Sequence, residues 1–222
     1  MAPFLRDALL NDPVDMRVAD LVRDLDEPFN AQDPDHLDAC RQLWQAAWAN
    51  VPFAGVVHEG WTRLGFRTGD LTKELQTGGI ALVHNLLKLA TFSPTLFASA
   101  LEGDCPLAQA CLAVGFLLRE YLRLHVPGTV RQPIGGSGQV ASDETLRRFL
   151  LWDANCPDAF DMIHLEFLVY LLWGDTELHG RQEQTTLMGF HKALVQTRKR
   201  IERTLPRIKA GVCYKVKTIT TN

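Results

Sequence analysis

The 222-residue sequence lacks the cysteine pattern of a disulfide framework or a zinc knuckle. Its cysteines are odd in number and form no Cys-x-x-Cys pair; they are Cys40, Cys105, Cys111, Cys156 and Cys213. Secreted small domains depend on paired cysteines, whereas cytosolic proteins keep their thiols reduced. We therefore expect a cytoplasmic protein with reduced thiols in its core and no bound metal.

Long hydrophobic runs and an excess of positive charge are also missing. The most apolar runs, Pro106 to Leu118 and Ile163 to Trp173, are shorter than the roughly 20 residues that a transmembrane helix needs. Arg6 and Asp7 interrupt the first residues before a signal-peptide stretch develops, so we expect no secretion. The formal charge of −3 provides no overall positive field, which argues against nucleic acid as a partner.

Helical periodicity is what the sequence does contain. Apolar residues make up 46% of the chain, enough for a buried core. Steps of three or four residues predict helices over 18–25 and 37–48, and a C-terminal amphipathic helix built on Leu187, Phe190, Leu194, Ile201 and Leu205. We find no internal repeat and no set of alternating strands. The prediction is an all-α fold, a single compact multi-helix domain.

Local signals predict where several helices begin and end. Ser93-Pro94 combines a hydroxyl cap with proline at the first helical position, and Ser142 precedes two carboxylates, so helices should start at both places. The second should run to Leu151 or Trp152. Leucines follow helical steps from 70 to 90, but Gly78-Gly79 in the middle predicts a break or bend.

The distribution of glycine and proline predicts the larger divisions of the chain. The stretch from Val126 to Val140 is rich in both residues and is predicted to be one long loop. We expect an N-terminal helical extension over 1–32, the main helical domain over 33–210 and a tail over 211–222.

Residues able to carry chemistry occur, but in spacings that do not support a site. His164 and Glu166 point to different sides of a helix, so a core or surface histidine is the better interpretation. His36 and Cys40 share a helical face, yet their neighbours indicate packing rather than a catalytic dyad. The glycines at 135–138 lack the lysine of a phosphate-binding loop. We expect no cofactor.

A basic series runs along the last predicted helix and beyond it, and consists of Arg198, Lys199, Arg200, Arg203, Arg207 and Lys209. Such a face is usually just solvated. Peripheral contact with an acidic membrane is the alternative that we keep open.

One stretch resembles a known family. From Trp61 the chain reads WTRLGFRTGDLTKELQTGGIALVHNLLKLATF, which is similar to the signature of the ELMO domain and its smaller ELMOD relatives. The matching residues are Trp61, Gly65, Phe66, Gly79, Leu82, Leu86 and Leu87, with Leu43-Trp44 matching an upstream Leu-Trp. The looser likeness spans about residues 33 to 206.

The departures from the family pattern concern its functional centre. Without gaps, Arg67 stands at a glutamine, Lys73 at a threonine, Glu74 at an aspartate and Gln76 at an arginine. In the ELMOD members that arginine is implicated in stimulating GTP hydrolysis by Arf and Arf-like GTPases. An arginine that neutralises the transition state contributes on the order of a thousandfold in rate, and neutral Gln76 cannot replace it.

The resemblance therefore implies a regulator or scaffold that binds a small GTPase of the Arf or Arf-like type, or a scaffold protein, without arginine-finger catalysis. The predicted protein-binding residues are Trp61, Arg67, Lys73, Glu74 and Gln76. The alternatives are an active GTPase-activating protein that uses Arg67, Lys73 or another basic residue, and a helical domain with an unrelated binding role.

Overall fold

The computed structural model describes residues 13–124, 139–156, 158–174 and 184–207. Its elements are α2 (Pro13–Leu25), α3 (Pro34–Ala47), η1 (Glu59–Leu64), α4 (Leu71–Gly78), α5 (Ala81–Phe92), α6 (Pro94–Glu102), α7 (Leu107–Tyr121), α8 (Asp143–Asn155), α9 (Ala159–Trp173), α11 (Phe190–Thr204) and η2 (Leu205–Arg207), where η denotes a 3-10 helix. The described ranges contain no strand and one isolated bridge, between Val57 and Asp70. The predicted all-α class is confirmed.

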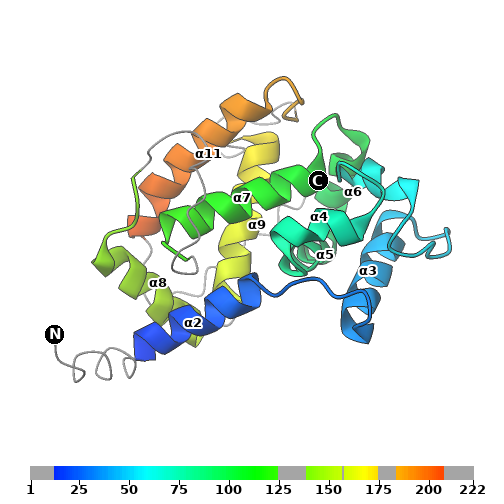
Figure 1. The fold of residues 1–222 in the computed structure, drawn as a ribbon. Helices are drawn as coiled ribbons and strands as arrows, with labels where there is room; N and C mark the ends of the chain where they lie inside the picture. Colours follow the sequence, from blue (N-terminus) through cyan, green and yellow to red (C-terminus); the bar gives the residue numbers. More distant parts are fainter. Residues whose placement is uncertain (1–12, 125–138, 157, 175–183, 208–222) are drawn as a thin grey trace.

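Helices α7 and α9 form the centre of the fold. Both are apolar around most of their circumference, as helices enclosed by other helices have to be. They pack on each other, and each also packs on α5 and α11. Figure 1 shows α8 and α11 on one side of this pair and α3 to α6 on the other. One continuous hydrophobic cluster joins the two sides.

Two predicted helix starts differ in how they are capped. Ser142 accepts a hydrogen bond from the Thr145 N–H at 3.2 Å, and α8 ends at Asn155, slightly beyond the predicted end. α6 begins at Pro94 as predicted, but the Ser93 hydroxyl makes no cap bond, which corrects that detail. Ser93 also ends α5, and its ψ of 66° differs from the extended conformation that places a cap oxygen over the first turn.

The predicted break at Gly78-Gly79 is confirmed. α4 ends at Gly78, and Gly79 has φ 61° and ψ −168°, a conformation that L side chains rarely adopt. The next amide, Ile80 N–H, donates to the carbonyl oxygen of Glu27 at 3.1 Å. The connector between α2 and α3 thereby holds the corner at which α4 turns into α5.

The predicted long loop lies almost wholly outside the described residues, and the predicted tail over 211–222 lies entirely outside them. The division of the chain into 1–32, 33–210 and 211–222 stays a prediction. Within the described part, α2 packs on α8, and Arg17 pairs with the buried carboxylate of Asp153 at 2.7 Å.

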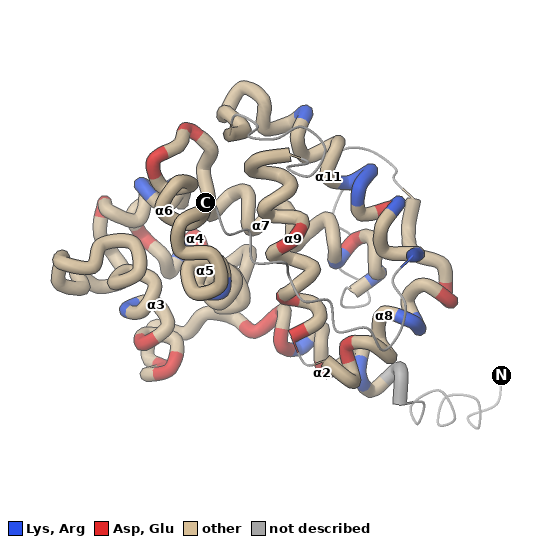
Figure 2. The backbone as a smooth tube through the Cα atoms, turned by 180° about the vertical axis from the view of Figure 1, so that it is seen from behind, with Lys and Arg blue, Asp and Glu red and all other residues tan. Residues whose placement is uncertain are grey.

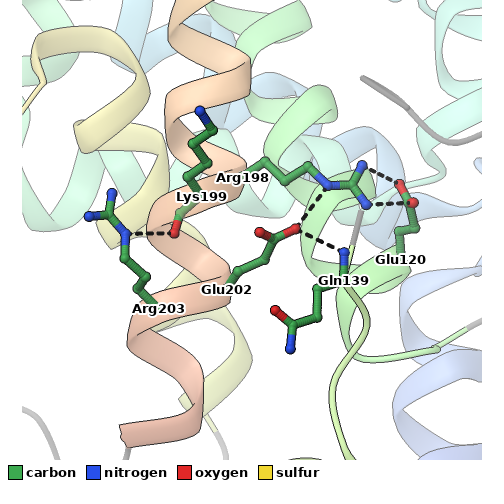
Figure 3. A network of polar contacts seen from close by, with 6 residues as sticks. All are labelled: Glu120, Gln139, Arg198, Lys199, Glu202 and Arg203. Carbon is green, nitrogen blue, oxygen red and sulfur yellow. Dashed lines mark hydrogen bonds and ion pairs between the residues drawn. The ribbon is translucent and has the colours of Figure 1, made fainter. Parts of the chain in front are cut away.

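Arg198 does not belong to a solvated basic face, which corrects the prediction for this residue. Its side chain is only 11% exposed. The guanidinium donates to Glu120 on α7 at 2.9 Å and to Glu202 on its own helix at 3.2 Å (Figure 3). Glu202 in turn accepts from the backbone N–H of Gln139 at 3.2 Å. Arg198 lies beside the apolar face of α11 and reaches the carboxylate of Glu120 there. The pair thus joins α11 to α7.

Among the described helices, no single one is both long enough and apolar enough to span a bilayer. α6 and α7 are long and apolar enough only when they are taken together, and a bend of 117° separates them.

Candidate functional site

An aromatic cluster underlies the chain that leads into α4. Its rings come from the end of α3, the following loop, η1 and the segment just after η1: Trp44, Trp48, Phe53, Trp61 and Phe66. The Trp44 and Trp61 rings lie 5.0 Å apart at 68°, and the Trp61 and Phe66 rings lie 6.1 Å apart at 88°. Edge-to-face contacts of this kind add to the energy of burial. The cluster fixes where η1 lies against α3.

Backbone hydrogen bonds then tie the chain before η1 to the chain before α4. His58 N–H donates to the Gly69 carbonyl at 2.7 Å, and Leu71 N–H donates to the Val56 carbonyl at 3.0 Å. The two bonds flank the bridge at Val57 and Asp70. Residues 58–69 therefore form a closed loop whose two ends meet at the start of α4.

Trp61, a predicted protein-binding residue, is completely buried. Its indole N–H donates to the Gly55 carbonyl at 3.0 Å, so its polar atom is also satisfied internally. The side chain cannot touch a partner, which corrects its predicted role as a contact residue. Trp61 instead packs beneath the loop over 58–69, which carries exposed residues.

The first turn of α4 holds a lysine in a defined position. The carboxylate of Asp70 caps the helix by accepting from Thr72 N–H at 3.0 Å, and it pairs with the Lys73 ammonium at 3.0 Å. Hydrogen bonds from the Thr72 side chain and then from Lys73 hold the pKa of Asp70 below its ordinary value. The Lys73 side chain is 72% exposed, so this cation faces solvent with its own counter-ion beside it.

Glu74 connects α4 to the preceding loop. One of its carboxylate oxygens accepts from both the N–H and the hydroxyl of Thr68, each at 3.0 Å. The neighbouring Arg67 is exposed and donates to the side chain of Gln109 at 3.3 Å. The loop carrying Arg67 is therefore fixed against α4.

Gln76 is exposed on the following turn of α4. Its three-residue spacing from Lys73 puts the two side chains on the same side of the helix. The predicted residues Arg67, Lys73, Glu74 and Gln76 thus belong to one stretch of surface, which we call the α4 surface.

Two arginines that lie on rings of the aromatic cluster were missed by the sequence analysis. The Arg41 guanidinium lies 5.6 Å from the Phe53 ring centre, and that of Arg63 lies 6.0 Å from the Trp48 ring centre. Arginine on half-buried aromatic rings is a composition typical of binding hot spots. The signal available in the sequence was the four-residue spacing of Trp44 and Trp48, which predicts that both rings lie on one side of α3.

His36, Cys40 and His164, which the sequence analysis weighed as candidates for chemistry, are engaged or enclosed within the fold. His36 accepts from Asn30 N–H at 3.0 Å, while burial raises the pKa of the Cys40 thiol to about 12 and keeps it protonated. His164 is buried with Nε2 2.9 Å from the Cys111 carbonyl oxygen, and burial lowers its pKa to about 4. The interpretation of His164 as a core or surface histidine is confirmed, and the structure places it in the core.

A cavity of about 30 Å³ lies beside His164, Gly115 and Asn85, whereas ligand pockets usually measure several hundred Å³. Within the part of the chain that the structure describes, no group of three or more His, Cys, Asp or Glu is arranged to hold a metal ion.

Comparison with known proteins agrees with the resemblance seen in the motif. A model of the ELMO/CED-12 family matches residues 19–192, which include the aromatic cluster, the α4 surface and both central helices. Searches of curated proteins and of solved structures gave no significant match. Since the family model covers more than half of the sequence, the chain belongs to the ELMO/CED-12 family.

Proposed function

We propose that this chain is a cytoplasmic, non-catalytic ELMO module that binds a small GTPase of the Arf or Arf-like type through the α4 surface. The exposed positions of Arg67, Lys73 and Gln76 support this assignment, because all three are accessible to a partner. Family membership supports a general ELMO-domain role. The GTPase as partner and the absence of catalysis are our proposal.

The observation that carries the proposal is the exposed neutral amide of Gln76 where the family resemblance expects an arginine. Negative charge builds up on the phosphoryl oxygens during GTP hydrolysis, and a guanidinium stabilises it by charge and by paired hydrogen bonds. An amide offers hydrogen bonds without charge. Bound GTPase should therefore keep close to its intrinsic rate of hydrolysis.

The alternative function is GTPase activation by another cation. Arg67 favours this alternative more than Lys73 does, because Arg67 has a guanidinium whose 3.3 Å contact with Gln109, within the described part of the chain, a partner could replace. Lys73 is paired with Asp70 at 3.0 Å and has no planar fork. If Arg67 serves as the finger, Arg67→Ala abolishes the acceleration while binding persists.

A binding experiment tests the proposed surface. A panel of Arf and Arf-like GTPases, each loaded with a non-hydrolysable GTP analogue or with GDP, is titrated with the chain. We expect at least one GTPase to bind, and Lys73→Glu with Gln76→Glu to weaken that binding at least tenfold, since a truncated or repelled hot spot costs about 2 kcal/mol.

Arg23→Glu with Gln45→Glu is the matched control. It makes the same two exchanges of charge on exposed positions of α2 and α3. The α4 surface is rejected as the site if this control weakens binding as much as the test pair does. The absence of binding to every GTPase would contradict the proposed partner class.

A further inference from the structure

A stripe of cations runs along the outward side of α11. At 3.6 residues per turn, Lys192, Lys199 and Arg203 fall within about 40° of one another around the helix axis. The buried residues of the helix, Leu194 and Ile201, lie on the opposite side. The stripe therefore faces away from the core, and all three of its cations are exposed.

These three cations differ from Arg198, which the fold uses internally. None of the three forms an ion pair with the described residues, whereas Arg198 is paired with Glu120 and Glu202. Figure 3 shows Arg203 on the other side of α11 from this paired network. The charge of the stripe is thus available to a ligand outside the molecule.

Two apolar side chains project from the turn that leads into α11. Leu187, predicted to lie on the apolar face of the last helix, precedes α11 and is 63% exposed, which corrects that prediction. Met188 is 96% exposed. Adjacent large apolar residues in so exposed a position lose the energy of burial unless another surface covers them. They precede the first turn of α11, which carries Lys192, so the apolar tip lies at one end of the line of cations.

The charge of the molecule is unevenly distributed between its ends. The range 190–207 contains six Lys and Arg and one Glu, whereas the range 13–47 contains eight Asp and Glu and three Arg. In Figure 2, basic positions colour α11 and acidic positions gather around α2 and α3. An anionic surface would therefore attract the α11 end and repel the α2 and α3 end, which orients the molecule.

We propose that α11 and the preceding turn dock on a bilayer surface rich in anionic lipid. The cations Lys192, Lys199 and Arg203 contact the headgroups, and Leu187 and Met188 enter the boundary with the acyl chains. The apolar tip selects a membrane over a nucleic acid, because phosphates and bases at a duplex surface offer no apolar layer for it. Helix α11 lies away from α4 in Figures 1 and 2, so a membrane and a partner at the α4 surface can be bound together.

Vesicle co-sedimentation of the full chain tests the proposal. The probes are phosphatidylcholine vesicles with and without phosphatidylserine, at low and at high salt. The test variants are Lys192→Gln/Lys199→Gln/Arg203→Gln and Leu187→Ser/Met188→Ser. The matched control is Arg23→Gln/Arg123→Gln/Arg147→Gln, which removes the same charge from exposed positions outside α11. Far-ultraviolet circular dichroism checks that each variant is folded.

We expect binding to phosphatidylserine vesicles that weakens with salt, and none to phosphatidylcholine alone. A cation near an anionic membrane contributes about fivefold to the partition coefficient, so the α11 triple variant should lose roughly 100-fold and the control triple little. The Leu187/Met188 variant should lose about tenfold.

Three results would overturn the proposal: equal binding to both kinds of vesicle, binding by the α11 triple variant equal to wild type, or no loss in the Leu187/Met188 variant. Binding to heparin or duplex DNA without binding to vesicles would likewise reject it, in favour of a polyanion site. The proposed GTPase partner is unaffected by any of these outcomes.

Discussion

Replacing Gly79 by alanine should strongly destabilise the domain at the corner between α4 and α5. At φ 61° and ψ −168° the backbone is in a region reserved for glycine, which costs an L residue about 1–3 kcal/mol. The added methyl would also overlap the carbonyl oxygen of Glu27, which accepts the 3.1 Å hydrogen bond from Ile80 N–H. Displacing that acceptor leaves a buried amide unpaired, at a further cost of about 1–3 kcal/mol.

Two other glycines separate these contributions. Gly55 has φ 94° but open space around its missing methyl, so Gly55→Ala should cost only the backbone strain of about 1–2 kcal/mol. Gly115 lies inside α7. A methyl group added at this position would lie 3.6 Å from His164, which is an ordinary contact distance. Gly115→Ala should therefore be neutral or stabilising by up to about 1 kcal/mol.

Urea denaturation followed by tryptophan fluorescence and circular dichroism measures the three variants against wild type. We expect Gly79→Ala to lose about 3 kcal/mol or more of unfolding free energy, a drop of about 6–12 °C in melting temperature for a domain of this size. Equal losses in Gly79→Ala and Gly55→Ala would refute the reasoning, because they would show that the Glu27 contact does not hold the corner after α4.

Further predictions concern the buried histidine and the arginines of α11. Because the pKa of His164 is lowered to about 4 in the folded state and is near 6.5 when unfolded, its contribution to stability is complete above pH 6.5 and is lost as the pH falls from there toward 4. From pH 7 to pH 5 wild type should lose about 2 kcal/mol more than His164→Gln in urea titrations; equal losses would contradict this assignment. Arg198→Ala should cost about 3 kcal/mol because Glu120 and Glu202 lose their partner, whereas exposed Arg203→Ala should stay within about 0.5 kcal/mol; equal melting temperatures for the two variants would show that the network contributes nothing.

The spacing of apolar residues predicted the helices that bury only one face. The amphipathic patterns of α3 and α11, and the glycine break between α4 and α5, follow from spacing and backbone preference within one segment. The short helix η1 was not predicted, because six residues without a sustained period carry no such signal. Its position depends instead on the tryptophans packed beneath it.

Pairings between distant segments account for the errors at individual residues. Arg198 resembled one member of a solvated series, but its partner Glu120 is 78 positions away and spacing cannot reveal it. Trp61 was assigned to a binding surface because it opens the family motif, yet the Gly55 carbonyl and the neighbouring rings bury it. The contact of Thr68 with Glu74, which connects the preceding loop to α4, was not predicted either. The spacing of the two residues in the sequence does not indicate a contact.

Single-turnover GTP hydrolysis by the bound GTPase tests most directly whether the α4 surface binds a GTPase without supplying a catalytic cation. Wild type, Gln76→Arg and Thr77→Arg are compared at saturating concentration. Thr77 is the matched control, since it is exposed on the same helix and receives the same charge one residue away. We predict intrinsic rates with wild type and Thr77→Arg, and at least a tenfold gain with Gln76→Arg as part of the roughly thousandfold effect of a finger. Acceleration by wild type would contradict the claim.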